Sequence, residues 1–314
     1  MAGRQVFIST TSFARWDERP LRLLKDADLD VALNPHGRKL TGEEVVELAA
    51  GATGLIAGTE PLDAQVLNRL KQLKVISRCG VGMDNIDLET ARELGIKVFH
   101  TPYGPTLAVA ELTVGLILDL LRNVNQMDRE LRAGIWKKRM GYLLKGKKVG
   151  IIGFGRIGQK TGSLLMALGC KVSYYDIAAV DLRIEGLKDS GIKKLEMDDL
   201  LKVSDIIVIH VSGKYEKPLL GVEELNKMKK GAWLVNVARG GVVDGEALYL
   251  ALKEGRLAGA ALDVFEREPY NGPLKELDNV ILTPHIGSYA REARVEMEVQ
   301  AVENLLKGLM ADSS

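Results

Sequence analysis

The 314-residue sequence contains only two cysteines, Cys79 and Cys170, and aromatic residues make up just 5% of it. The two thiols have no C-x-x-C spacing and no neighbouring histidine, which argues against a disulfide scaffold and against a metal site. We expect both to be small buried hydrophobic residues. No metal is therefore predicted for this chain.

An excess of charge of either sign is also missing, because 43 Lys+Arg are balanced by 42 Asp+Glu. Proteins that bind nucleic acid or membrane surfaces through long-range attraction carry one-sided charge, so neither partner is expected. The longest candidate for an apolar span, Leu112 to Leu121, is interrupted by Asp119. Near the start, Val6-Phe-Ile-Ser-Thr is only strand-length and is not a secretion signal, so we expect a cytoplasmic protein.

What the sequence does contain is a regular alternation of β-type runs with helical patterns, in a chain long enough for two domains. Helical patterns lie near residues 18–27, 41–50, 62–71 and 87–94. They separate five predicted strands: Val6-Phe-Ile-Ser, Asp30-Val-Ala-Leu, Gly54-Leu-Ile-Ala, Lys74-Val-Ile-Ser and Lys97-Val-Phe-His. Such spacing predicts βαβ units and a mostly parallel sheet. The first hundred residues thus form a doubly wound domain, but one with no glycine fingerprint.

Thr101–Pro105 is a turn-rich break and a candidate hinge, and an apolar helix is predicted from Ala108 to Arg122. Six basic residues follow Trp136 in the stretch up to Lys148. The ordinary interpretation is a solvated loop with a hydrophobic anchor. The alternative is an arm that contacts a partner and lends positive charge to an anionic substrate.

Lys148 to Asp176 carries the most specific pattern in the chain. An apolar strand is followed by Gly153-Phe-Gly155-Arg-Ile-Gly158, which fits G-x-G-x-x-G, and then by a helical segment and a second strand. In this pattern Gly153 allows the tight turn, Gly155 lets the backbone approach a pyrophosphate, and Gly158 lets the helix pack on its strand. The helix N-terminus favours the negative charge of the pyrophosphate. The stretch predicts a dinucleotide-binding Rossmann fold.

Asp176 ends the second strand, 18 residues beyond Gly158. A carboxylate there is placed to accept hydrogen bonds from the adenosine ribose hydroxyls and would repel a 2′-phosphate. The following Ile177-Ala-Ala offers no basic residue to bind such a phosphate. NAD is therefore favoured over NADP as the cofactor.

Three later strands end in polar residues: Arg239, Asp263 with Glu268 beyond it, and His285. Ligands of open parallel sheets bind at the carboxyl ends of the strands, so these side chains should share one rim. There Arg239 would grip a substrate carboxylate through its planar fork, and His285 would exchange the hydroxyl proton as hydride moves. Glu268 would fix the histidine tautomer and raise its pKa. The other histidines are not expected to be catalytic: His36 is expected at the surface, and His100 and His210 are expected to be structural residues or neighbours of the cofactor.

The chain resembles the D-isomer-specific 2-hydroxyacid dehydrogenases, above all their short phosphoglycerate-dehydrogenase-like branch. The resemblance is carried by the glycine turn and by Arg78-Cys-Gly-Val-Gly-Met-Asp-Asn-Ile-Asp87, Val237-Ala-Arg-Gly-Gly-Val-Val-Asp244, Gly259-Ala-Ala-Leu-Asp-Val-Phe265 and Thr283-Pro-His-Ile-Gly287. It implies two doubly wound parallel-sheet domains. A Rossmann NAD domain, residues 100–287, would be inserted into a flavodoxin-like substrate domain of residues 1–99, completed by a C-terminal helix at 288–314.

The same resemblance implies the roles of Arg239, Glu268 and His285 given above and a small anionic 2-hydroxy or 2-keto acid as substrate. Asp263 would hold the nicotinamide carboxamide, and a homodimer would form through the NAD domain. The backbone of Arg78, Gly80, Val81 and Gly82 would contact the substrate carboxylate. The NAD site would be lined, besides the glycines, by Arg156, Ile157, Asp176, Val237, Ala238, Asp263 and Gly287.

The sequence departs from its relatives at three places. Gly58 stands where many phosphoglycerate enzymes carry a phosphate-binding arginine, Pro105 replaces a usual asparagine, and Val-Ser-Gly follows His210. The substrate thus stays open among 3-phosphoglycerate, hydroxypyruvate and glyoxylate. An NAD-sensing protein like the corepressors of this fold is an alternative function. Formate dehydrogenase is a further one, although its members pair the histidine with Gln and this chain has Glu268.

Overall fold

The computed structural model describes residues 5–182, 184, 187–188, 190–213 and 215–310. The chain divides into two compact units. Thr106–Gly287 forms the second domain, and the segments before and after it together form the first domain. The first domain is thus discontinuous in sequence, with the second inserted into it.

The first domain is built on a five-stranded parallel sheet in the order β2-β1-β3-β4-β5. Its strands are β1 (Gln5–Ile8), β2 (Asp30–Leu33), β3 (Gly54–Ala57), β4 (Val75–Arg78) and β5 (Lys97–His100). This is the strand order of flavodoxin-like folds, as the resemblance implies. All five predicted strands are present within one or two residues.

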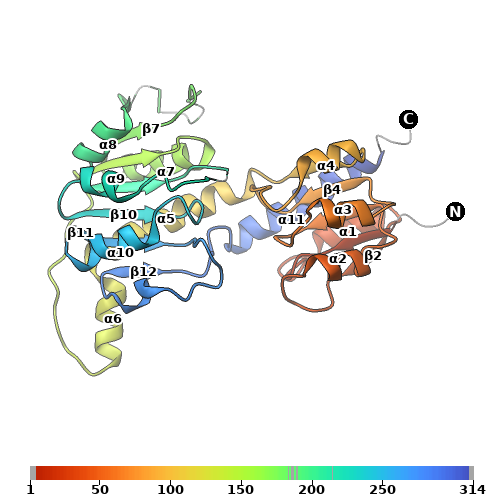
Figure 1. The fold of residues 1–314 in the computed structure, drawn as a ribbon, viewed down its shortest axis with the longest axis horizontal. Coiled ribbons are helices and arrows are strands. Elements are labelled where there is room, and N and C mark those ends of the chain that lie inside the picture. Colours follow the sequence, from red (N-terminus) through yellow and green to blue (C-terminus); the bar gives the residue numbers. More distant parts are fainter. Residues whose placement is uncertain (1–4, 183, 185–186, 189, 214, 311–314) are drawn as a thin grey trace. The chain divides into compact units, whose positions relative to one another are not determined.

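Helices cover both faces of this sheet (Figure 1). One face packs against α2 (Gly42–Leu48), α3 (Ala64–Arg69) and α4 (Leu88–Glu93). The other packs against α1 (Arg19–Asp26) and the last helix, α11 (Arg291–Met310). Met297, Ala301 and Leu305 of α11 are fully buried against the strands, so the C-terminal segment completes the core of the first domain. Residues 311–314 of the predicted C-terminal helix lie outside the described residues.

The second domain contains a seven-stranded parallel sheet in the order β12-β11-β10-β9-β6-β7-β8. Its strands are β6 (Lys148–Ile152), β7 (Lys171–Tyr175), β8 (Lys193–Lys194), β9 (Ile206–Ile209), β10 (Ala232–Asn236), β11 (Leu257–Leu262) and β12 (Val280–Leu282). Counted from β6 the order is that of the dinucleotide-binding fold with one strand added. The direction of winding reverses between β6 and β9, and ligands of such sheets bind at this point.

The helices of the second domain again lie on both faces of its sheet. One face carries α8 (Met197–Val203), α9 (Val222–Lys227), α10 (Gly245–Lys253) and the short η1 (Pro273–Glu276). The other carries α5 (Gly104–Arg122) and α7 (Arg156–Ala167). The β9 strand between them has no exposed residue, which explains its continuous apolar sequence Ile-Ile-Val-Ile.

Helix α5 begins at Gly104, earlier than the predicted start at Ala108. Pro105 stands in the first turn, where its missing N–H costs no helical hydrogen bond, so the expected break after Thr101 is shorter than predicted. The first domain accordingly extends to Pro105 rather than to residue 99. By length and composition alone, α5 could cross a membrane, whereas we expected no such segment. Half of its most apolar 18-residue stretch is buried inside the fold.

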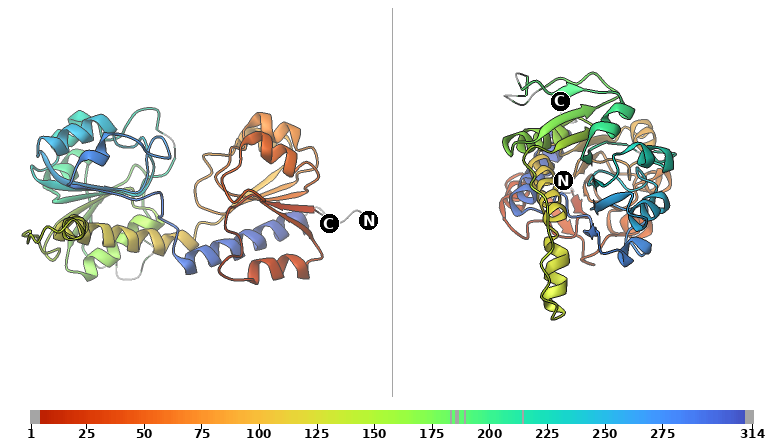
Figure 2. Two further views of the ribbon diagram at one scale, coloured as in Figure 1. Left: turned by 90° about the horizontal axis from the view of Figure 1, so that it is seen from below. Right: turned by 90° about the vertical axis from the view of Figure 1, so that its left-hand side faces the viewer.

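A projecting arm follows α5. It consists of α6 (Val124–Arg132) and an irregular segment up to Lys147, and both extend away from the sheet of the second domain (Figure 2). The sequence predicted a loop from Trp136, and no regular element is found there. The arm returns to the sheet where the rings of Tyr142 and Trp233 meet edge to face, with Lys147 above both rings.

Candidate active site

The glycine turn joins β6 to α7. Gly153 has a φ of +87°, and a Cβ there would lie 2.7 Å from the backbone of His210. A Cβ on Gly158 would lie 2.2 Å from the carbonyl oxygen of Gly153. A Cβ on Gly155, at the N-cap of α7, would instead meet no atom within 4 Å. Two of the glycines therefore serve packing, while the third leaves open space in front of the helix.

The residues around this space suit a pyrophosphate. Arg156 and Ile157 form the first turn of α7, and no side chain caps that end of the helix. The backbone amides at a helix N-terminus and the helix dipole favour an anionic ligand. Arg156 is exposed, so its guanidinium is also accessible to such a ligand.

Asp176 directly follows β7 and is half-buried. Its carboxylate accepts hydrogen bonds from the backbone N–H of Phe154, at 2.7 Å, and of Ala178, at 2.9 Å. A carboxylate has about four acceptor positions, so two stay open for ribose hydroxyls. The sequence pattern did not reveal that Asp176 also fixes the glycine turn.

Below the turn lies His210, whose Nε2 is 2.9 Å from the hydroxyl of Thr161 on α7. Desolvation lowers the pKa of His210 to about 3, so the imidazole stays neutral. This histidine ties α7 to the end of β9. The sequence predicted either a structural residue or a neighbour of the cofactor at this position.

The loop after β10 carries Arg239 and is held by Asn236. The Asn236 side chain donates to the carbonyl of Arg239, at 3.0 Å, and accepts from the N–H of Ala238, at 3.1 Å. Val237 and Ala238 are buried, and Arg239 is half-buried. A Cβ on Gly240 would lie 2.0 Å from the carbonyl oxygen of Phe265, so the loops after β10 and β11 touch through their backbones.

His285 and Glu268 are brought together from the loops after β12 and β11. Nδ1 of His285 lies 2.9 Å from one carboxylate oxygen of Glu268 and 3.1 Å from the other. The Glu268 carboxylate also accepts from the backbone N–H of Phe265, at 3.1 Å. Because Glu268 occupies Nδ1, the other ring nitrogen, Nε2, is the one available to a substrate. The imidazole is half-exposed, with a side-chain exposure of 52%.

Asp263 organises the backbone around His285. Its fully buried carboxylate accepts from the Thr283 hydroxyl at 2.6 Å, from the Ile286 N–H at 2.7 Å and from the Gly287 N–H at 2.8 Å. His285 itself has a φ of +55°, an uncommon conformation for a residue with a side chain. Three hydrogen bonds to one carboxylate thus hold the turn that aims the imidazole.

The charges of these groups act on one another. Glu268 raises the pKa of His285, first through the hydrogen bond and then through its charge, and Asp263 adds to this effect. The guanidinium of Arg239 lowers the same pKa, which places Arg239 within electrostatic range of the imidazole. Arg239, Glu268 and His285 therefore share one site at the carboxyl ends of β10, β11 and β12.

In the first domain, the loop Arg78–Gly82 follows β4 at the carboxyl end of the sheet. The amides of Cys79 and Gly80 donate within the protein, to the carbonyl of Ala57 at 2.9 Å and to the Thr101 hydroxyl at 2.7 Å. Those of Val81 and Gly82 donate to no acceptor among the residues that the structure describes. The loop thus has two adjacent amides to offer to an anion, next to the Arg78 side chain.

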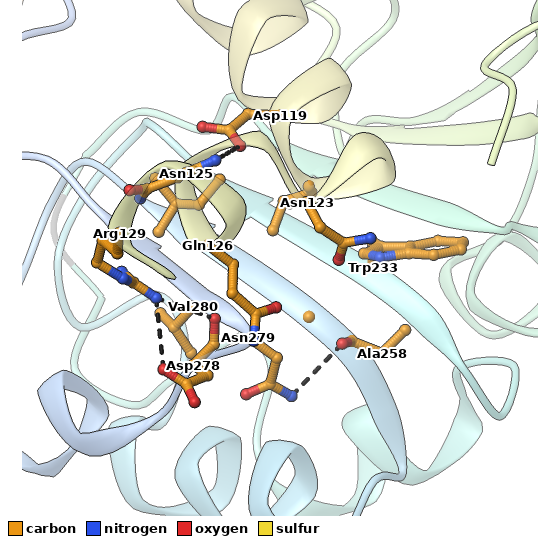
Figure 3. A pocket seen from close by; sticks show the side chains of 13 residues that line it. Asp119, Asn123, Asn125, Gln126, Arg129, Trp233, Ala258, Asp278, Asn279 and Val280 are labelled. Atoms are coloured by element: carbon orange, nitrogen blue, oxygen red, sulfur yellow. Dashed lines mark hydrogen bonds and ion pairs between the residues drawn. The ribbon is translucent and has the colours of Figure 1, made fainter. Parts of the chain in front are cut away.

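A small hollow in the second domain lies elsewhere (Figure 3). It is lined by the first residues of three strands and by the start of the arm, including Asn123, Gln126, Trp233, Gly259 and Val280. Strand beginnings form the edge of the sheet opposite the glycine turn. The hollow is therefore not part of the nucleotide site.

Comparison with known proteins identifies the family. The family model described as "D-isomer specific 2-hydroxyacid dehydrogenase, NAD binding domain" matches residues 114–287. A glyoxylate reductase of Thermofilum pendens is 46% identical over 266 residues, which are 81% of this chain and 77% of that protein. A D-3-phosphoglycerate dehydrogenase of Archaeoglobus fulgidus is 43% identical over 79% of this chain, but this covers only 48% of that longer protein.

Among solved structures, a D-lactate dehydrogenase from Aquifex aeolicus complexed with NAD and lactic acid is similar over 98% of this chain and 96% of that one. The TM-score is 0.83 and the identity 29%. These similarities confirm the predicted family, the Rossmann domain beside a substrate domain, and NAD as the cofactor. The chain belongs to the D-isomer specific 2-hydroxyacid dehydrogenases and is an NAD-dependent oxidoreductase.

Proposed function

We propose that this protein reduces small 2-keto acids to D-2-hydroxy acids with NADH, and catalyses the reverse oxidation with NAD. Glyoxylate and hydroxypyruvate are the first candidates, and phosphohydroxypyruvate is the third. The observation that carries the proposal is the His285–Glu268 pair, with Nδ1 at 2.9 Å from the carboxylate and Arg239 in electrostatic range. This group stands at the same edge of the sheet as the glycine turn.

NADH held at the glycine turn and Asp176 would supply the hydride in the direction of reduction. His285 donates a proton from Nε2 to the oxygen at C2 of the keto acid as C2 becomes tetrahedral. Glu268 keeps Nδ1 as a hydrogen-bond donor and stabilises the imidazolium, which makes protonation available near neutral pH. In the oxidation the same nitrogen takes the hydroxyl proton.

Arg239 binds the carboxylate of the substrate and stabilises the negative charge that develops on the C2 oxygen. Asp263 acts through the backbone of residues 283–287 and positions His285. The amides of Val81 and Gly82, together with Arg78, supply the contact to the substrate carboxylate from the first domain. We keep the predicted nucleotide contacts at the glycine turn, Asp176, Val237, Ala238 and Gly287.

A panel of 2-keto acids tests this function. Hydroxypyruvate, glyoxylate, pyruvate and 3-phosphohydroxypyruvate are each added to the protein with NADH, and the loss of NADH absorbance is followed. We expect sustained turnover with at least one of them and formation of the D-enantiomer where the product is chiral. Tight NADH binding with no turnover on the whole panel would instead favour an NAD-sensing binding protein.

We also infer that two copies associate through the arm of the second domain. Apolar side chains on the arm are unusually exposed, with Trp136 at 81%, Met140 at 93% and Leu143 at 76%. Leu131 and Ile135, also on the arm, are each more than half exposed. Large apolar side chains exposed along one projecting segment indicate a protein interface. A second copy of this chain is the partner that family resemblance implies.

A further inference from the structure

A buried carboxylate lies at the carboxyl end of the first-domain sheet, outside the residues assigned so far. Glu60 is only 1% exposed and follows β3 by three residues. Its carboxylate accepts a hydrogen bond from the Ser9 hydroxyl. The backbone N–H of Gly58 donates to the same carboxylate and lies 2.9 Å from one of its oxygens and 3.1 Å from the other. Within the part of the chain that the structure describes, Glu60 forms no ion pair, so no cation directly neutralises it.

Glu60 is adjacent to the loop that offers its amides to the substrate. Ala57 pairs with Arg78 in the sheet, and the amide of Cys79 donates to the Ala57 carbonyl. Beyond the strands, the Asn85 side chain donates to the carbonyls of Glu60, at 2.7 Å, and of Gly58, at 3.3 Å. The segment carrying Glu60 and the segment following the loop are thus hydrogen-bonded side by side.

The groups proposed to bind an anion lie at the carboxyl ends of the first-domain strands, which we call the rim. Val81 and Gly82 present two amides, and Arg78 brings one positive charge. The Gly58 amide, the next donor along the rim, is already used by Glu60, and a Cβ on Gly58 would lie 2.9 Å from the Glu60 carboxylate. A second anionic group on a short substrate would therefore meet a buried negative charge in place of a donor.

We propose that Glu60 is a specificity-determining residue that favours substrates with a single negative charge, such as hydroxypyruvate and glyoxylate, over phosphorylated 2-keto acids. The inference rests on the proposed function. Its physical basis is like-charge repulsion, which is strong where water is excluded because the local dielectric constant is low. Hydroxypyruvate and 3-phosphohydroxypyruvate differ only by the phosphate, so the ratio of their kcat/KM values isolates the effect.

The test is Glu60→Gln, which removes the charge and keeps the shape. We expect the kcat/KM ratio of 3-phosphohydroxypyruvate to hydroxypyruvate to rise about tenfold, mainly through KM of the phosphorylated substrate. Ser9→Ala removes one hydrogen bond and leaves the charge, and Glu47→Gln removes an exposed charge on α2. Both controls should leave the ratio within about twofold. A purely structural Glu60 would change both substrates equally, and an unchanged ratio in folded Glu60→Gln overturns the inference.

A measurement on the unmodified protein covers the case in which Glu60→Gln does not fold. As the pH falls through about 6, a phosphate monoester takes up a proton and keeps one negative charge, so the same ratio should rise if the rim repels the phosphate. A ratio that falls as the pH is lowered indicates attraction and overturns the inference. Absence of any turnover with hydroxypyruvate would overturn the proposed function itself, whereas equal use of both substrates would leave that function standing and remove only the role of Glu60.

Discussion

The imidazole of His285 is the group on which the proposed chemistry depends most directly. His285→Gln removes the proton donor but keeps a side chain of similar size. We expect turnover to fall by at least 10²-fold, with NADH affinity changed by no more than a few-fold, because the nucleotide site lies at the glycine turn. Steady-state rates and NADH fluorescence titration measure the two quantities. His36→Gln, in the exposed turn after β2, is the control. Normal turnover in His285→Gln would refute the assignment.

Glu268 should control the pH range of activity. It raises the pKa of His285, and reduction requires the protonated imidazole, so the rate of reduction is lost as pH rises through that pKa. Glu268→Gln removes the main cause of the increase. The pH profile of kcat/KM for reduction should therefore lose its plateau at lower pH than in the unmodified protein. The profile for oxidation should shift in the same direction, and an unshifted pair of profiles would contradict the role.

Asp176 has two functions in the structure, and its replacement should reveal both. Asp176→Ala opens the ribose site to a 2′-phosphate and removes the acceptor of the Phe154 amide. We expect the preference for NADH over NADPH to shrink about tenfold or more, with weaker binding of NADH as well. The kcat/KM ratio for the two cofactors measures this. Asp26→Ala, an exposed carboxylate at the end of α1, should change nothing. Selectivity retained in Asp176→Ala would argue against contact with the ribose.

The sequence predicted the location of a site residue where that residue directly follows a recognisable strand. Arg239, Glu268 and His285 follow apolar runs, and parallel strands bring their ends to one rim. The supporting residues were not predictable in this way. Asn236 and Thr283 stand inside apolar runs and look like ordinary strand residues. Asn236 bonds to the loop that directly follows it, and the partner of Thr283, Asp263, comes from the loop after another strand. The environment of Glu60 was likewise not predictable, because its hydroxyl partner Ser9 lies 51 residues away in the sequence.

Among the elements, the loops after β10 and β11 lie in close backbone contact at Gly240. Gly240→Ala would place a Cβ 2.0 Å from a backbone carbonyl, so one loop must move. We expect a loss of stability of about 1–3 kcal/mol and a higher KM for substrate, because Arg239 and Glu268 lie on these two loops. Thermal unfolding and steady-state kinetics measure the effects.

Gly245→Ala provides the matched control for this prediction. Gly245 begins α10, has ordinary helical geometry, and offers open space to a Cβ. Alanine favours helices over glycine, so this variant should be as stable as the unmodified protein or slightly more stable. Equal thermal stability and equal KM values in Gly240→Ala and Gly245→Ala would contradict the importance of the contact between the two loops.

The regular elements of the sheets were predicted well because their signal is local. Short apolar runs and glycine turns mark them, and the strands are found within a few residues. Helix α6 was not predicted, since it has no buried residue and its sequence is polar. The strand predicted at Lys193-Lys-Leu-Glu is present but shorter, because β8 contains only the two lysines, which pair with β7.

For the molecule as a whole, the exposed arm predicts association. Replacing Trp136 and Met140 together by aspartate places charges on the most exposed apolar side chains of the arm. We expect the mass measured by light scattering to fall from that of a dimer to that of a monomer, while the circular dichroism spectrum is retained. Leu33→Asp, an exposed apolar residue on β2, is the control and should stay dimeric. A monomeric unmodified protein would contradict the arm interface.

The discontinuous first domain imposes an order on biosynthesis. Val6, Ile8 and Ile56 pack against Val302 and Leu305, so β1 and β3 leave the ribosome well before the helix that covers them. All strands of the nucleotide-binding sheet, in contrast, are encoded between those two segments. The first domain is consequently completed only after the second has been synthesised. Until α11 leaves the ribosome, one apolar face of the nascent first-domain sheet has no α11 to cover it.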